Sequence, residues 1–142
     1  MTPEAIGVIL ATITATTGII ISFIVYLGQK KLSKRQFIIP LWEHMTSLND
    51  LNPSEIVIPH VIKTVNTLEL IAISCEGKMI DEAIIIRSYA HQFVYNFETV
   101  QKCPTMPALN NKSGQDLLNE CPAVIAFYNK IKQHLINLTK IK

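Results

Sequence analysis

Three side chains that can bind an anion recur at every fourth position in the second half of the chain. Arg87, His91 and Tyr95 stand four residues apart, so on a helix they form one stripe. A guanidinium beside an imidazole and a phenol can hold a phosphate group and stack against a base. Lys63 and Lys78 are bases near them in sequence and would add charge. The stripe predicts a site for an anionic ligand, and it also fits an ordinary solvated helix face.

Arg87 has a second interpretation, as the partner of a buried carboxylate. It is the only arginine after Arg35, and Glu69 stands within the apolar run of residues 68–73. A buried carboxylate requires a partner of opposite charge. We expect Glu69 and Arg87 to form this ion pair, and anion binding by Arg87 is the alternative.

The residues that usually carry catalysis or bind metal are scattered along the chain. No C-x-x-C or H-x-x-x-H spacing, no P-loop and no G-x-S-x-G motif is present. The cysteines are expected to be buried, unreactive thiols: Cys75, Cys103 and Cys121. The sequence therefore predicts a protein that is not an enzyme, with no catalytic residue, no metal site and no cofactor.

An uncharged apolar run occupies residues 5–27. At about 1.5 Å per residue, a helix of this length covers about 34 Å, enough to cross roughly 30 Å of hydrocarbon. The run raises the mean hydropathy to +0.27, and only 17% of the residues are charged. A cleaved signal peptide is the alternative, but the basic start that is typical of one is missing. We therefore expect a transmembrane helix in contact with the lipid bilayer.

Basic residues follow the apolar run directly, at Lys30, Lys31, Lys34 and Arg35. The positive-inside rule keeps such a flank in the cytoplasm. The sequence thus predicts a single-pass protein of the inner (cytoplasmic) membrane, with its N-terminus outside and its C-terminus in the cytoplasm. Two domains are expected: the transmembrane helix and basic flank over residues 1–31, and a cytoplasmic helical domain over residues 32–142.

Small residues recur along one side of the predicted transmembrane helix. The stripe consists of Gly7, Ala11, Thr14, Gly18 and Ser22. In lipid, such a stripe allows two helix backbones to approach closely and associate. We expect a homo-oligomer with this interface, and a single anchor with incidental small residues is the alternative.

The rest of the chain has helical periodicity, with segments at residues 59–76, 82–101 and from 122 onward. No alternating pattern is long enough to predict a strand. The expected core faces are Val61, Val65, Leu68, Ala72 and Cys75, then Ile86, Ala90, Phe93, Phe97 and Val100, then Val124, Phe127, Ile131, Leu135 and Leu138. The predicted fold is all-α, with one N-terminal transmembrane helix followed by a bundle of four to five helices.

Residues that start and stop helices mark the boundaries of these segments. Gly77 is expected to adopt a left-handed conformation that ends the first segment. Asp81 is a predicted N-cap for the second segment. Ser113 and Asp116 have the spacing of a capping box ahead of a short helix.

Residues 65–101 resemble a family of small bacterial proteins with one N-terminal membrane helix and a helical cytoplasmic domain. The matching residues are Asn66, Leu68, Glu69, Gly77, Ile80, Asp81 and Glu82. The layout alone is also similar to membrane effectors of anti-phage systems, such as type III CRISPR accessory proteins. That resemblance implies a cytoplasmic domain that senses a cyclic oligoadenylate and a helix that disturbs the bilayer; it assigns no ligand-binding residue.

The expected function is that of a non-enzymatic membrane effector or sensor in anti-phage defence. A cytoplasmic signal, such as an anionic nucleotide, would change the packing of the membrane span in a homo-oligomer. The alternative is a passive membrane-anchored scaffold or subunit that tethers a protein partner. A net charge of +2 gives no strong attraction to double-stranded nucleic acid, and we expect no such partner.

Overall fold

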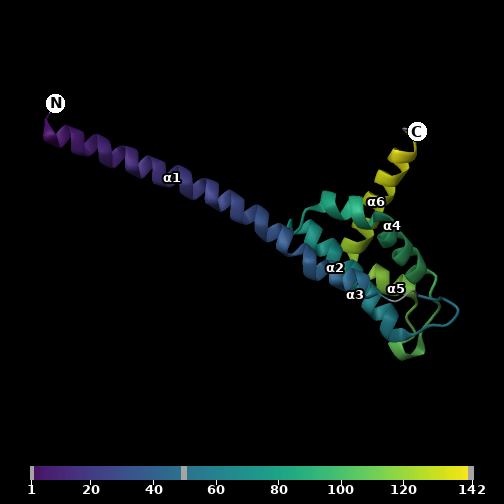
Figure 1. Ribbon diagram of the computed structural model, residues 1–142. Coiled ribbons are helices and arrows are strands. Elements are labelled where there is room, and N and C mark those ends of the chain that lie inside the picture. The colour runs from purple at the N-terminus through teal and green to yellow at the C-terminus, as the bar shows by residue number, and fades with distance from the viewer. Residues whose placement is uncertain (1, 49–50, 141–142) are drawn as a thin grey trace. The chain divides into compact units, whose positions relative to one another are not determined.

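The computed structural model describes residues 2–48 and 51–140, and in these ranges every regular element is a helix (Figure 1). The predicted all-α fold is therefore confirmed. The chain divides into two compact units, Met1–Gln36 and Phe37–Lys142. This boundary lies after Gln36 rather than after Lys31, because the first helix continues through the basic flank without interruption. We call Phe37–Lys142 the helical unit.

The first unit is the helix α1, Pro3–Gln36, whose 34 residues cover about 51 Å. Its apolar side chains are exposed, with Ile19 at 71%. The threonine hydroxyls are satisfied within the helix: those of Thr12 and Thr16 donate to the carbonyl oxygens of Val8 and Thr12 at 2.8 and 2.7 Å. The most apolar part of the chain from Ala5 to Thr46 has a mean hydropathy of 2.3. By length and composition, α1 is able to cross a membrane.

The helical unit is built around three helices that pack on one another. These are α3 (Ile58–Glu76), α4 (Glu82–Gln101) and α6 (Pro122–Lys140). The shorter α2 (Ile38–Thr46) packs on α3, and α5 (Gly114–Asn119) packs against all three long helices. A 3₁₀ turn, η1 (Pro107–Leu109), lies in the loop before α5.

Aromatic rings join α4 to α6 in the core of the helical unit. Phe93 meets Phe127 edge to face, with ring centroids 5.1 Å apart. Phe97 stacks on Tyr128 at 3.9 Å with an interplanar angle of 14°. The Tyr128 hydroxyl also donates a 2.9 Å hydrogen bond to Glu98, which fixes the register of the two helices.

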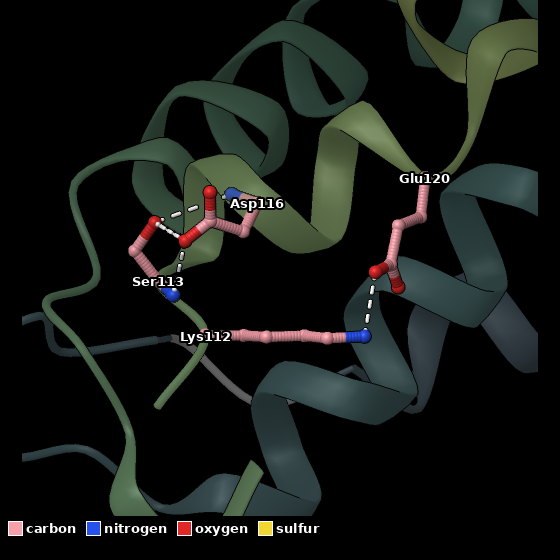
Figure 2. A network of polar contacts seen from close by, with 4 residues as sticks. All are labelled: Lys112, Ser113, Asp116 and Glu120. Atoms are coloured by element: carbon pink, nitrogen blue, oxygen red, sulfur yellow. Dashed lines mark hydrogen bonds and ion pairs between the residues drawn. The ribbon is translucent and has the colours of Figure 1, made fainter. Parts of the chain in front are cut away.

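Two predicted caps are confirmed. The Asp81 carboxylate accepts a 3.1 Å hydrogen bond from the Ala83 amide at the start of α4. Figure 2 shows the capping box of α5, in which Asp116 accepts from the Ser113 amide at 2.8 Å and the Ser113 hydroxyl accepts from the Asp116 amide at 3.2 Å. An ion pair between Lys112 and Glu120 spans the ends of the same helix (Figure 2).

The prediction that Gly77 adopts a left-handed conformation is wrong. Gly77 has φ −70° and ψ 0°, while Lys78 has φ 54°. The amides of Lys78 and Met79 donate to the carbonyls of Cys75 and Ser74 at 3.0 Å each, which is the Schellman pattern. Because α3 extends through Glu76, the left-handed position falls one residue later than the glycine.

The predicted core faces are confirmed for α3 and corrected at two places elsewhere. In α4, Ile85 is fully buried, whereas Ile86 is only partly buried. In α6, Leu138 is 51% exposed and Leu135 is partly buried. The reason is that the last turns of α6 extend past the other helices of the unit (Figure 1, yellow), so the apolar stripe continues where little covers it.

Candidate functional site

A cavity of about 500 Å³ lies between the first half of α4 and the last turns of α6. Three groups that can carry positive charge line it: Arg87 and His91 from α4 and His134 from α6. No carboxylate is among the lining residues. The remaining surface is apolar and consists of Ala83, Ile86, Ala90, Leu135 and Leu138. We call this the α4–α6 cavity.

The helical register explains how these side chains come to share one cavity. Arg87 and His91 are one turn apart on α4, and Ala90 lies between them on the side that faces α6. The small Ala83 and Ala90 leave room beside α6, and His134 reaches the cavity from one turn before Leu138. The α4–α6 cavity exists because the apolar side of α6 is longer than the part of it that α4 covers.

The chemistry of the α4–α6 cavity suits an anionic group attached to an apolar body. Arg87 offers the planar set of donors that matches phosphate and carboxylate oxygens. The two imidazoles add donors, and the leucine and alanine side chains offer an apolar wall. Because the wall lowers the local dielectric constant, an anion is attracted more strongly here than on an open surface.

The predicted ion pair between Glu69 and Arg87 is wrong. Within the described part of the chain, no ion pair involves either residue. Arg87 is exposed at the α4–α6 cavity, and Glu69 is only partly buried beside Cys121. Burial raises the pKa of the Cys121 thiol, and the nearby Glu69 raises it further. Glu69 keeps partial access to water, so it does not need a buried cation.

The structure brings together only two of the five predicted ligand residues. Tyr95 is 51% exposed and does not line the α4–α6 cavity. Lys63 donates a 2.9 Å hydrogen bond to the Ser47 carbonyl near the start of α3, and Lys78 lies after its end. Those two lysines are about 22 Å apart along the helix, so they cannot contact one small ligand together.

His134 is the residue of this cavity that sequence reasoning missed. It stands 43 positions after His91 (134 minus 91), and only the packing of α6 on α4 brings the two imidazoles to one cavity. No local spacing signals such a pair. In the sequence, the apolar Leu138 one turn later is the residue which indicates that the apolar side of α6 continues past His134.

The cysteines are free and buried, as predicted. Burial raises the pKa of Cys75 to about 12, and the nearby Glu82 carboxylate contributes in the same direction. Burial also raises the pKa of the Cys103 thiol. These thiols stay protonated at neutral pH and are poor nucleophiles. Among residues 2–48 and 51–140, no cluster of histidine, cysteine and carboxylate side chains is arranged to hold a metal ion.

The chain was compared with protein-family models, with curated proteins and with solved structures. No match was found. Evidence on function therefore comes from the geometry and chemistry of the chain itself.

The small-residue stripe of α1 is exposed along its whole length. Its members are Gly7, Ala11, Thr14, Gly18 and Ser22. No atom lies within 4 Å of the position that a Cβ would take at Gly7 or Gly18. The Thr14 hydroxyl donates to the Leu10 carbonyl at 2.9 Å, so it is satisfied inside the helix. The stripe is thus an exposed surface of small side chains.

Proposed function

We propose that this protein is a non-enzymatic, membrane-anchored sensor that binds a phosphate-bearing ligand, such as an anionic nucleotide, in the α4–α6 cavity. The observation that carries the proposal is the convergence of Arg87, His91 and His134 on a cavity lined by no carboxylate. Because Arg87 has no ion-pair partner in the described part of the chain, its charge is available to an external anion. The apolar wall would contact the nucleoside.

The anchoring part of the proposal rests on α1. Its apolar side chains are exposed and its threonine hydroxyls bond to its own backbone, both of which suit a lipid environment. The basic residues after it favour a cytoplasmic position of the helical unit under the positive-inside rule. The exposed small-residue stripe would join copies of α1 into a homo-oligomer, so that ligand binding in the helical unit changes how the spans pack.

Calorimetric titration of the full chain in detergent tests the ligand site. The probes are adenosine 5′-monophosphate and inorganic pyrophosphate. We expect Arg87→Ala to weaken binding of both probes at least about tenfold, because each loses charge-assisted hydrogen bonds. Lys102→Ala is the matched control, since it removes one exposed cation at the opposite end of α4. Equal binding by Arg87→Ala and the wild type, or no binding of either probe, would overturn the anion site.

A passive scaffold is the second candidate, and one observation favours it. The outer side of α3 exposes three large apolar side chains, Ile62 at 38%, Leu70 at 47% and Ile73 at 48%. Exposed apolar side chains grouped on one helix are typical of a surface that binds another protein. Under this hypothesis neither probe binds, and the ligand-site variants leave the protein's behaviour unchanged.

A further inference from the structure

A second cavity, of about 350 Å³, lies on the other side of α4, against α2. Its lining residues are Trp42, Met45, Thr46 and Leu48 with Tyr89, Gln92 and Asn96. None of these side chains carries a charge, in contrast to the α4–α6 cavity. We call it the α2–α4 cavity. All of it belongs to the helical unit.

Polar side chains of α4 form a hydrogen-bonded chain along this cavity. The Gln92 amide nitrogen donates to the Asn96 side-chain oxygen at 3.1 Å. The Asn96 amide nitrogen in turn donates to the Tyr89 hydroxyl oxygen at 3.2 Å. Tyr89 and Asn96 are each only 7% exposed. An amide and a phenol buried this far are costly unless hydrogen-bonded, and these bonds give each of their buried polar atoms at least one partner.

The direction of these two hydrogen bonds leaves one donor and one acceptor unused. Tyr89 accepts from Asn96, and in the described residues its own hydroxyl proton has no acceptor. Burial raises the pKa of Tyr89 to about 12, so the hydroxyl keeps its proton at neutral pH. Gln92 uses its amide nitrogen toward Asn96, which leaves its side-chain oxygen as an acceptor. The residues that line the cavity therefore include one hydrogen-bond donor, the Tyr89 hydroxyl, and one acceptor, the Gln92 side-chain oxygen.

Trp42 supplies the aromatic surface of the cavity. Its neighbours on α2, Leu41 and Met45, are 5% and 4% exposed and anchor that helix in the core. Trp42 lies about 60° from Met45 around the helix, so it lines the cavity beside Met45 while staying 43% exposed. Indole rings stack well on flat, neutral ring systems.

We propose that the α2–α4 cavity binds a neutral, planar ring with a hydrogen-bond acceptor next to a donor, the chemistry that nucleobases and aromatic amides share. The ring would stack on Trp42, while its polar edge would accept from Tyr89 and donate to Gln92. Positions 87 and 89 are about 200° apart around α4, so this cavity and the α4–α6 cavity lie on different sides of the helix. The site is therefore separate from the anion site proposed above.

Trp42 makes the proposal directly testable, because it is the only tryptophan in the chain. The full chain in detergent is titrated with adenosine, with uridine and with nicotinamide while tryptophan fluorescence is recorded. We expect a saturable change. Binding of the nucleosides but not of nicotinamide would identify a base as the ligand. Binding of nicotinamide but not of the nucleosides would identify an aromatic amide.

Two tyrosine variants separate the site from general effects. Tyr89→Phe removes only the hydroxyl and is expected to weaken binding about fivefold, the effect of one hydrogen bond. Tyr95→Phe makes the same change at an exposed position of α4 outside the cavity and should bind like the wild type. Thermal melts of both variants establish that they fold.

Arg87→Ala distinguishes this proposal from the proposed anion site. It is expected to bind the neutral probes as well as the wild type does, whether or not it binds phosphate. The proposal is overturned by three results: no saturable fluorescence change with any probe, equal affinities for Tyr89→Phe and the wild type, or loss of binding in Arg87→Ala alone.

Discussion

Glycines in α1 and in the helical unit stand in opposite surroundings. At Gly18 of α1, a Cβ atom would meet nothing within 4 Å. At Gly114 of α5, the same atom would lie 1.8 Å from the carbonyl oxygen of Val100. In the helical unit, therefore, a glycine serves packing inside one chain. In α1 the space beside the glycine is left open by the single chain, and a second copy of α1 would have room to enter it.

Hydroxyl side chains behave alike in the two units, since Thr64 and Ser88 of the helical unit also donate to the carbonyl four residues earlier, but α4 adds hydrogen bonds between side chains. Each threonine hydroxyl of α1 returns to the carbonyl four residues earlier, as Thr17 does to Ile13 at 2.8 Å. On α4, Gln92, Asn96 and Tyr89 bond to one another beside a cavity. A helix in lipid must satisfy its polar groups locally, whereas a helix in a water-facing unit can direct them toward a ligand. The contrast is in keeping with the proposed roles, anchoring by α1 and recognition by the helical unit.

The largest effect is expected from Gly114→Ala. The new methyl group would displace the backbone of Val100 or break the 3.1 Å hydrogen bond from the Gly114 amide to the Cys103 carbonyl. Overpacking of this kind costs about 3 kcal/mol, which lowers the Tm of a domain of this size by more than about 10 °C. Thermal unfolding followed by Trp42 fluorescence measures it in the full chain.

Gly18→Ala is the matched control, because the same substitution falls where α1 has open space. It should leave the Tm of the helical unit unchanged. A Gly114→Ala protein that melts within about 2 °C of the wild type would show that the end of α4 adapts easily. The contrast between the glycines of the two units would then lose its main support.

A smaller effect is expected from Gly18→Ile on self-association. A branched side chain in the small-residue stripe holds two backbones apart and should weaken association by about 1–2 kcal/mol, comparable to other contacts between membrane helices. Sedimentation equilibrium in detergent measures it. Gly28→Ile makes the same change outside the stripe, at a position equally free of neighbours, and should associate like the wild type. Monomeric wild-type protein, or equal loss in both variants, would remove α1 as the interface.

Local signals in the sequence were sufficient for most of the helical unit. Asp81, Ser113 and Asp116 cap their helices as predicted, since a cap depends on residues within one turn. The buried face of α3 also follows from its own period, because a helix that packs against several others buries a continuous stripe.

Features that depend on distant residues were missed. The approach of Val100 to Gly114 and the meeting of His134 with His91 arise only when helices pack. The predicted pair of Glu69 with Arg87 failed for the same reason: opposite charges are common in a sequence, but their side chains project from different sides of the packed helices. The place of Trp42 in a cavity could not be predicted from the sequence, because the cavity is lined by residues of both α2 and α4 and forms only in the folded chain.

The smallest predicted effect tests the polar contact that joins α4 to α6. Hydrogen bonds from the Tyr128 hydroxyl and from Lys132 lower the pKa of Glu98 below its ordinary value of 4.5. A carboxylate with a lowered pKa in the folded state stabilises the protein above its unfolded pKa, and this stabilisation is lost as the pH falls through the folded value. Because Glu98 is partly exposed, its charge contributes only about 0.5 kcal/mol.

Glu98→Gln should therefore be less stable than the wild type by about 0.5 kcal/mol at pH 7, since the amide keeps the shape but loses the charge. The difference should shrink as the pH falls below 4.5. Urea unfolding of the full chain between pH 7 and pH 3 measures both curves. Glu55→Gln, at an exposed position that forms no ion pair in the described part of the chain, should follow the wild type at every pH. Parallel curves for Glu98→Gln and the wild type would mean that the charge of Glu98 adds nothing to the packing of α4 on α6, which then rests on contacts such as those of Phe93 with Phe127 and of Phe97 with Tyr128.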